Sequence, residues 1–318
     1  MTQPDYRRRR ILIWGKTRPE LSKTYREIVC TGGVFEDSRR LVRLYPIPLR
    51  FLESARVFQK YQWIEADVTR NLSDPRPESH KIRYEGIVTG ETIPTHKGNW
   101  DARALWVMQP DNLFESVEAL KVRQQIDKTS LGIVHPARVS EITSHRTSTQ
   151  EKAEFLERYR EAVQQMELPL DPDTGREIRP LRPGDYRFKV HFRCDDSQCQ
   201  TDHIFSVLDW EIDALYFRLH TENGQPPELA AQGVVEKLWE ICGPDKDTHF
   251  FLGNIANHPQ NFTIVGLWYP KKKTEDPQVT LFDRVHRAAL SATQEALEST
   301  RSDIPGRGRE PLGLPACS

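Results

Sequence analysis

The sequence predicts an α+β fold, with a β-rich N-terminal module that contains short helices, followed by a mixed region. Three observations support this class. Several segments of the N-terminal half alternate apolar and polar side chains with the period of a half-buried strand. Strand and helix patterns follow one another in irregular order, which disfavours a doubly wound parallel sheet. A hairpin pattern flanked by helical patterns follows near the C-terminus.

The N-terminal module is predicted to cover residues 1–146. Strands are expected at 10–17, 39–52, 61–71, 81–93 and 131–143, where apolar residues form a run or alternate with polar ones. A first helix is expected over 18–33, because Pro19 suits its first turn and Gly32-Gly33 suit its end. A second helix is expected over 111–126, where apolar residues recur with helical spacing.

The remaining residues are predicted to form a connector, a second structured region and a tail. Residues 147–182 hold a charged amphipathic helix at 147–167, which opens with a Ser/Thr cap, and then a proline-rich connector. Residues 183–300 are predicted to be an α+β region. Its expected elements are a strand at 186–194, a helix or strand-to-helix passage at 205–220, a helix at 226–242, a hairpin of strands 248–254 and 262–270, and a helix at 280–299. The proline- and glycine-rich residues 301–318 are predicted to be disordered.

Composition disfavours several classes of protein. Hydrophobic residues make up 37% of the chain and charged residues 29%, which is enough apolar material for a core. No apolar run approaches the roughly 18 residues of a transmembrane helix, so no membrane partner is expected. The apolar run after the basic N-terminus is too short for a signal peptide, so we expect a cytoplasmic location. No glycine-rich loop matches a phosphate or dinucleotide motif, and no nucleotide cofactor is expected.

The segment HFRCDDSQCQTDH has the spacing H-x2-C-x4-C-x3-H. Thiolate sulfur and imidazole nitrogen are the ligands that zinc prefers, usually four of them in a tetrahedron. A turn through DDSQ would bring the two thiolates together. Because four protein ligands leave no position for water, the pattern predicts a structural zinc knuckle rather than a catalytic centre. The candidate ligands are His191, Cys194, Cys199 and His203.

The fourth ligand of this knuckle is left open. His191 and Cys194 lie three residues apart on an expected strand, so their side chains point to opposite faces. Cys242 or Asp196 could replace His191. The alternative interpretation is that Cys194 is a small buried hydrophobic residue and that the histidines are surface residues. The five cysteines, an odd number, argue against a disulfide framework.

The net charge of −1 hides an asymmetry along the chain. Residues 1–100 contain 19 Lys and Arg against 12 Asp and Glu, and the remainder therefore contains 26 against 34. Basic side chains next to aromatic rings are what single-stranded nucleic-acid binding uses, through phosphate contacts and base stacking. The candidate residues are Arg39, Arg43, Tyr45, Arg50 and Arg76. The alternative is a scatter of solvated charges around aromatic residues that belong to the core.

An acidic stretch, DWEIDA, follows the knuckle. Asp209 and Glu211, with His203, could hold a hard cation such as Mg²⁺ and catalyse hydrolysis. A nuclease of the restriction type would also place a lysine shortly after the acids, but the nearest basic residue downstream is Arg218. The alternative is a helix N-terminus enriched in acids, which the helix dipole favours.

These patterns predict a bacterial-type nucleic-acid-binding protein with a structural zinc knuckle. The first alternative is a metal-dependent nuclease or hydrolase that uses Asp209, Glu211 and His203. The second alternative is a non-catalytic interaction subunit that binds a protein partner through the helix at 147–167.

Overall fold

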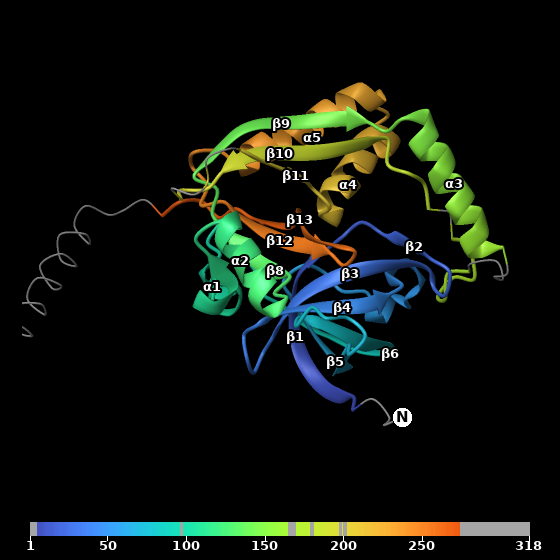
Figure 1. Ribbon diagram of the computed structural model, residues 1–318. Helices are drawn as coiled ribbons and strands as arrows, with labels where there is room; N and C mark the ends of the chain where they lie inside the picture. The colour runs from blue at the N-terminus through green and yellow to red at the C-terminus, as the bar shows by residue number, and fades with distance from the viewer. Residues whose placement is uncertain are drawn as a thin grey trace, which may run out of the picture. The chain divides into compact units, whose positions relative to one another are not determined.

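Strands and helices are both present in the computed structural model, which describes residues 5–95, 98–164, 170–178, 181–196, 199 and 202–273 (Figure 1). The predicted α+β class is confirmed. The strands are β1 (Arg7–Lys16), β2 (Glu20–Ser22), β3 (Arg26–Phe35), β4 (Leu41–Ile47), β5 (Gln62–Arg70), β6 (Ser79–Thr92), β7 (Leu113–Phe114), β8 (Leu131–Val134), β9 (Arg138–Arg146), β10 (Tyr186–Arg193), β11 (His203–Ser206), β12 (His249–Ile255) and β13 (His258–Trp268). The helices are η1 (Leu49–Phe51), η2 (Ser54–Arg56), α1 (Asp101–Val107), η3 (Pro110–Asn112), α2 (Val117–Asp127), α3 (Thr149–Val163), α4 (Trp210–Phe217), η4 (Arg218–Glu222) and α5 (Pro227–Ile241).

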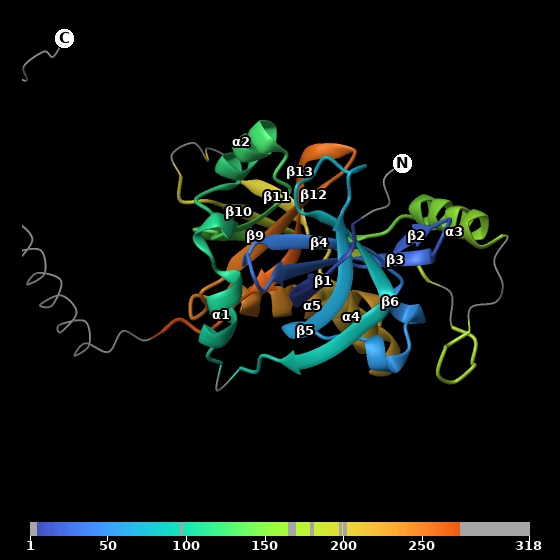
Figure 2. The ribbon, with the colours of Figure 1, turned by 90° about the horizontal axis from the view of Figure 1, so that it is seen from below.

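Five strands of the N-terminal region close into a barrel (Figures 1 and 2). β1 pairs with β5, β5 with β6, β6 with β4, β4 with β3, and β3 again with β1. Within this ring only the β4–β6 pair is parallel. Numbered along the chain, the barrel strands therefore lie in the order first, second, third, fifth, fourth and back to first. This is the strand order of the OB fold, a five-stranded Greek-key barrel.

The sequence of β1 is explained by burial on both of its faces. Ile11 and Ile13 belong to the core inside the barrel. Leu12 and Trp14 point the opposite way and belong to a second core outside it. A strand that is buried on both faces is an unbroken apolar run, which is why ILIW does not alternate. The Trp14 ring stacks on Phe251 of β12, with 4.4 Å between the ring centroids.

The helix expected over residues 18–33 is wrong, because these residues form β2 and β3. β3 pairs with β1 along one edge and with β4 along the other, and these tertiary pairings override the local helix signals. The glycine pair lies within β3 and is needed for packing. A Cβ at Gly32 would lie 2.2 Å from Cζ2 of Trp14, so no larger residue fits beneath that ring.

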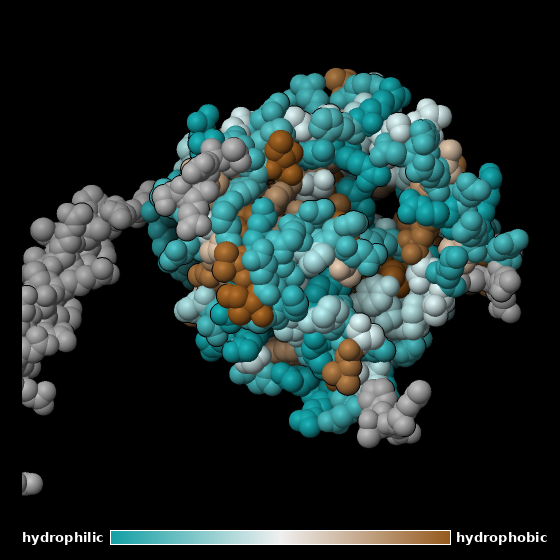
Figure 3. All heavy atoms as spheres, viewed as in Figure 1, coloured by the Kyte–Doolittle hydropathy of each residue, from teal (hydrophilic) through white to brown (hydrophobic). Residues whose placement is uncertain are grey.

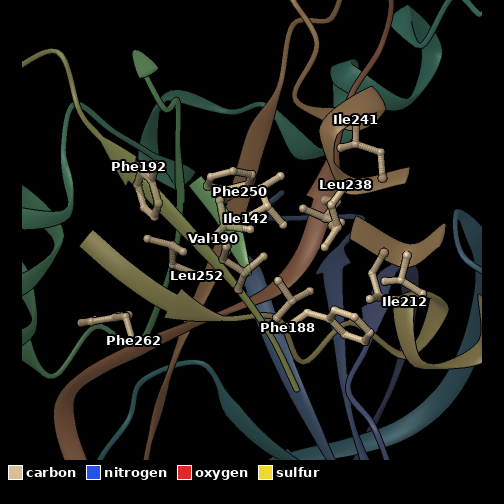
Figure 4. Packing of buried hydrophobic residues seen from close by; sticks show 14 of the residues in the cluster. Ile142, Phe188, Val190, Phe192, Ile212, Leu238, Ile241, Phe250, Leu252 and Phe262 are labelled. Atoms are coloured by element: carbon tan, nitrogen blue, oxygen red, sulfur yellow. The ribbon is translucent and has the colours of Figure 1, made fainter. Parts of the chain in front are cut away.

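The C-terminal region surrounds its own hydrophobic core with two sheets and the helices α4 and α5 (Figure 4). One sheet has the order β13-β12-β8-β7 and the other β11-β10-β9. The strand expected at 186–194 is confirmed as β10, and its alternate residues Tyr186, Phe188, Val190 and Phe192 are buried. The expected hairpin is confirmed as β12 and β13, and the helix expected at 226–242 as α5.

The core outside the barrel, to which Leu12 and Trp14 belong, lies where the second region covers part of the barrel. Leu131 of β8 packs with Val34 and Leu41, which point outward from β3 and β4. A backbone bridge also joins Thr17, just after β1, to Asp209 at the start of α4. The outer face of the second and third barrel strands is therefore only partly open to solvent.

The other expectations have different outcomes. The strand expected at 131–143 is two strands, β8 and β9. The helix expected at 111–126 is α2, preceded by η3 and β7, and the helix expected at 147–167 is α3, which lies beside β2 in both ribbon views (Figures 1 and 2). The helix at 280–299 and the tail at 301–318 lie outside the described residues. The boundaries at residues 146 and 182 stay predictions.

The chain divides into Met1–Lys271 and Lys272–Ser318, and only Lys272 and Lys273 of the second unit are described. No helix within the described residues is long and apolar enough to cross a membrane. On the face of the molecule seen in Figure 3, hydrophilic residues predominate and hydrophobic residues form separate groups.

Candidate functional sites

A cluster of four metal-ligand side chains lies where β10, β11 and α2 meet. Cys194 follows β10, Cys199 lies in the next loop, and His203 begins β11. Glu118 reaches the same point from the first turn of α2. The possible ligand atoms of these four residues all lie within 4.8 Å of one another. The structure therefore brings Cys194, Cys199 and His203 together, as the sequence predicts.

The distances within this Glu-Cys-Cys-His cluster suit a tetrahedral ion. The Sγ of Cys199 lies 3.2 Å from Nε2 of His203, and that nitrogen lies 3.3 Å from Oε1 of Glu118. Zinc bonds of about 2.0–2.3 Å imply tetrahedral edges of about 3.3–3.8 Å between ligand atoms. The cluster is thus compatible with a bound metal.

The electrostatics of the cluster favour a cation. Cys194, Cys199 and His203 are all at least nine-tenths buried. Burial raises the pKa of the Cys194 thiol to about 12, with a smaller opposing effect from its hydrogen bond to the backbone of Val117. The Oε2 atom of Glu118 is also buried and has no hydrogen-bond partner among the described residues. A divalent ion would stabilise these thiolates and give the orphaned carboxylate oxygen a partner.

His191 is not part of the cluster. Its side chain points to the opposite face of β10 from that of Phe192, because side chains alternate along the strand. Its Nδ1 lies 3.3 Å from a carboxylate oxygen of Glu141 on β9. Glu118 takes the fourth position instead. Nothing in the sequence marks Glu118 as a ligand, because it is distant along the chain and an acid in a first helical turn is common.

The acidic stretch forms the start of α4, as the alternative interpretation expects. Asp209 is the N-cap, and its Oδ1 accepts a hydrogen bond from the backbone N–H of Glu211 at 2.9 Å. Lys60, just before β5, donates to Asp209 at 3.0 Å and to Glu211 at 3.3 Å. His203 belongs to the metal cluster, so the structure does not group the three residues of the nuclease hypothesis. The carboxylates of Asp209 and Glu211 form ion pairs with Lys60 instead.

The pair of Lys60 and Asp209 is deeply buried, with side-chain exposures of 11% and 2%. Burial lowers the pKa of Lys60, but the charges of Asp209 and Glu211 outweigh this effect and raise it above its ordinary value. Lys60 is therefore a cation at neutral pH. Its position could not be anticipated, because it comes from a loop in the other half of the chain.

Asp213, one turn further along α4, gives stability a specific pH dependence. Burial raises its pKa from 3.8 to about 6, against the opposing charge of Arg18, whose Nε lies 3.3 Å from Asp213 Oδ2. Between these values the folded state holds a proton that the unfolded state releases, so this contribution to stability falls as pH rises. We expect the free energy of unfolding of wild type, relative to Asp213→Asn, to fall by about 2 kcal/mol from about pH 4 to 6. Urea unfolding at several pH values measures this difference, and a pH-independent difference would contradict it.

Three of the five predicted nucleic-acid residues bind partners within the protein. Arg43 is buried and donates to the backbone oxygen of Ser130 at 3.3 Å. Arg50 pairs with the buried Glu27 at 3.1 Å. Arg76 forms a two-pronged pair with Asp74, with its shortest contact at 2.6 Å.

Arg39 and Tyr45 are exposed, but on different parts of the barrel. The Arg39 guanidinium lies over the Trp106 ring at 4.9 Å from its centroid. Tyr45 is 43% exposed on the outer face of β4, directly beside Lys81 in the parallel pair with β6. Tyr25, 37% exposed, immediately precedes β3, and its ring packs edge-on against Tyr84 of β6. Burial is the main cause of the raised pKa of Tyr45, and nearby Tyr25 contributes to it.

Comparison with known proteins gives families but no activity. Residues 113–286 match the family described as domain of unknown function DUF8757, and residues 7–109 match domain of unknown function DUF8758. No curated protein matches the chain. One solved structure that matches is a replication protein A heterotrimer bound to ssDNA, at 11% identity, with 90% of this chain and 70% of that chain covered. Its TM-score of 0.23 is too low to establish a common fold.

Proposed function

Since the chain belongs to the family DUF8757, whose description gives no activity, we propose from the geometry that it binds single-stranded nucleic acid and carries a structural zinc ion. The observation that supports nucleic-acid binding is the strand order of the barrel. Barrels of this order bind oligonucleotides on the outer face of their second and third strands, which are β3 and β4 here.

The open part of that face has the side chains that single strands require. Tyr25 and Tyr45 offer exposed rings for base stacking, and Lys81 offers an exposed ammonium group for a phosphate. The other part of the face is covered, because Leu41 and Arg43 contact β8 and the residue before it. The proposed footprint is therefore short, a few nucleotides along β4 and β6.

Zinc is the proposed metal because of the ligand types. Two cysteines and one histidine are typical zinc ligands, and a glutamate is an accepted fourth. Four protein ligands close the coordination sphere, so the ion would stabilise the junction of β10, β11 and α2 rather than activate water.

Nucleic-acid binding is tested with the double variant Tyr25→Ala/Tyr45→Ala. Each stacked base is worth about 1–3 kcal/mol, so we expect the Kd for a single-stranded oligonucleotide of about 15 nucleotides to rise about tenfold or more. Fluorescence anisotropy with labelled DNA and RNA at several salt concentrations measures the effect. Lys81→Gln should weaken binding and also reduce its salt dependence.

The matched control is Trp239→Ala, which removes a ring of similar exposure, 42%, from α5. This variant should bind like wild type. Wild-type protein that binds neither oligonucleotide, or a double variant that binds as well as wild type, would overturn the proposal.

A further inference from the structure

Cys30 lies on β3, beside the buried side chain of Arg43 on β4. Its thiol is free and half-buried. Arg43, on the neighbouring strand β4, donates from Nη1 to the Cys30 Sγ at 3.4 Å. The other end of the guanidinium is fixed, because Nη2 donates to the backbone oxygen of Ser130 at 3.3 Å and contacts its hydroxyl at 3.4 Å. The sulfur and the guanidinium therefore have one defined arrangement.

A small cavity borders both groups. Its volume is about 10 Å³, and its polar lining is Lys16, Thr17, Cys30 and Arg43. A volume of this size holds about one water-sized molecule. The apolar part of the wall includes Trp14 and Leu131 of the core between the two regions.

Arg43 has a hydrogen-bond donor that nothing in the described residues satisfies. The residue is 8% exposed, and its buried Nε has no hydrogen-bond partner. Leaving a buried donor unpaired costs about 1–3 kcal/mol, and more for a charged group. Because Arg43 also lines the cavity, a small molecule with an acceptor oxygen is the ligand that this pocket suits.

We propose that Cys30 is a peroxide-reactive cysteine, with Arg43 as its positioning residue. Thiolates are the nucleophiles, and the hydrogen bond from Arg43 holds the Cys30 sulfur in place beside the cavity. The Cys30 thiolate attacks one oxygen of hydrogen peroxide, an S–O bond forms, and the O–O bond breaks. Hydroxide leaves and takes a proton from solvent. The sulfur is oxidised by two electrons to sulfenic acid, and the peroxide is reduced to water.

The cavity sets the size of the oxidant. Hydrogen peroxide is a small oxidant with oxygens that can accept from Arg43, whereas a bulky disulfide such as oxidised glutathione is far larger than the cavity. This inference is independent of nucleic-acid binding and of the metal.

The test compares two cysteines within wild-type protein. Cys242 is the matched control, since it is also free and half-buried, but burial raises its pKa to about 12. The protein is treated with hydrogen peroxide and dimedone, and labelled cysteines are quantified by peptide mass spectrometry over time. We expect Cys30 to be labelled at least about tenfold faster than Cys242. Equal or slower labelling of Cys30 would overturn the proposal.

A variant separates the effect of Arg43 from exposure alone. Arg43→Met should reduce the labelling rate of Cys30 about tenfold, while circular dichroism monitors folding. If the variant keeps its fold and Cys30 still reacts at the wild-type rate, Arg43 has no positioning role. If the variant unfolds, both cysteines are exposed and label alike, and the wild-type comparison then decides.

Discussion

Cys199→Ser is expected to abolish stoichiometric metal binding and to make the protein much less stable. Cys199 is the member of the Glu-Cys-Cys-His cluster that contacts both His203 and the backbone N–H of Cys194. A ligand that binds only the folded state, present at 1,000 times its Kd, contributes about 4 kcal/mol to stability, and this contribution would be lost. Elemental analysis of purified protein measures the metal, and urea unfolding measures the free energy.

The control for this prediction is Cys242→Ser. Cys242 is a free cysteine that packs against the same hydrophobic core but does not belong to the Glu-Cys-Cys-His cluster. The control should keep its metal and lose only a little packing energy. A chelator should destabilise wild type and the control, but leave Cys199→Ser unchanged. Wild-type protein purified without metal, and insensitive to added zinc, would contradict the zinc assignment.

The spacing of cysteine and histidine predicted three cluster members because they lie on consecutive, locally folded segments. A strand, a turn and the next strand bring Cys194, Cys199 and His203 together with little help from the rest of the chain. Glu118 could not be predicted, since its position depends on how α2 packs against the β-sheets. The same reason explains Lys60, whose partners Asp209 and Glu211 come from the other half of the chain.

Strands could be predicted where one face is buried, as in β10, because alternation records burial directly. The failure at residues 18–33 has the opposite cause. There Pro19 and the Gly32-Gly33 pair imitate helix ends, while the real constraint on Gly32 is a tryptophan from another strand. Arg43 is buried and Arg50 half-buried for a related reason. Arg43 and Arg50 are basic residues that the protein uses to satisfy its own buried acceptors.

Lys60→Met is expected to lower the free energy of unfolding by about 3–5 kcal/mol, the usual cost of breaking a buried ion pair by removing one partner. The cost arises because Asp209, only 2% exposed and with its pKa already raised by burial, would be left buried without its partner. Lys237→Met is the control. Its pair with Glu240 is exposed, and exposed pairs are worth about 0–1 kcal/mol. Urea unfolding at neutral pH measures both variants.

The double variant Lys60→Met/Asp209→Asn separates charge from packing. Asparagine caps a helix about as well as aspartate, so α4 keeps its N-cap while the buried charge is removed. The double variant should therefore be more stable than Lys60→Met alone. If the double variant is less stable than the single one, Asp209 is not desolvated by its surroundings, and the pair holds the barrel to α4 through packing rather than through charge.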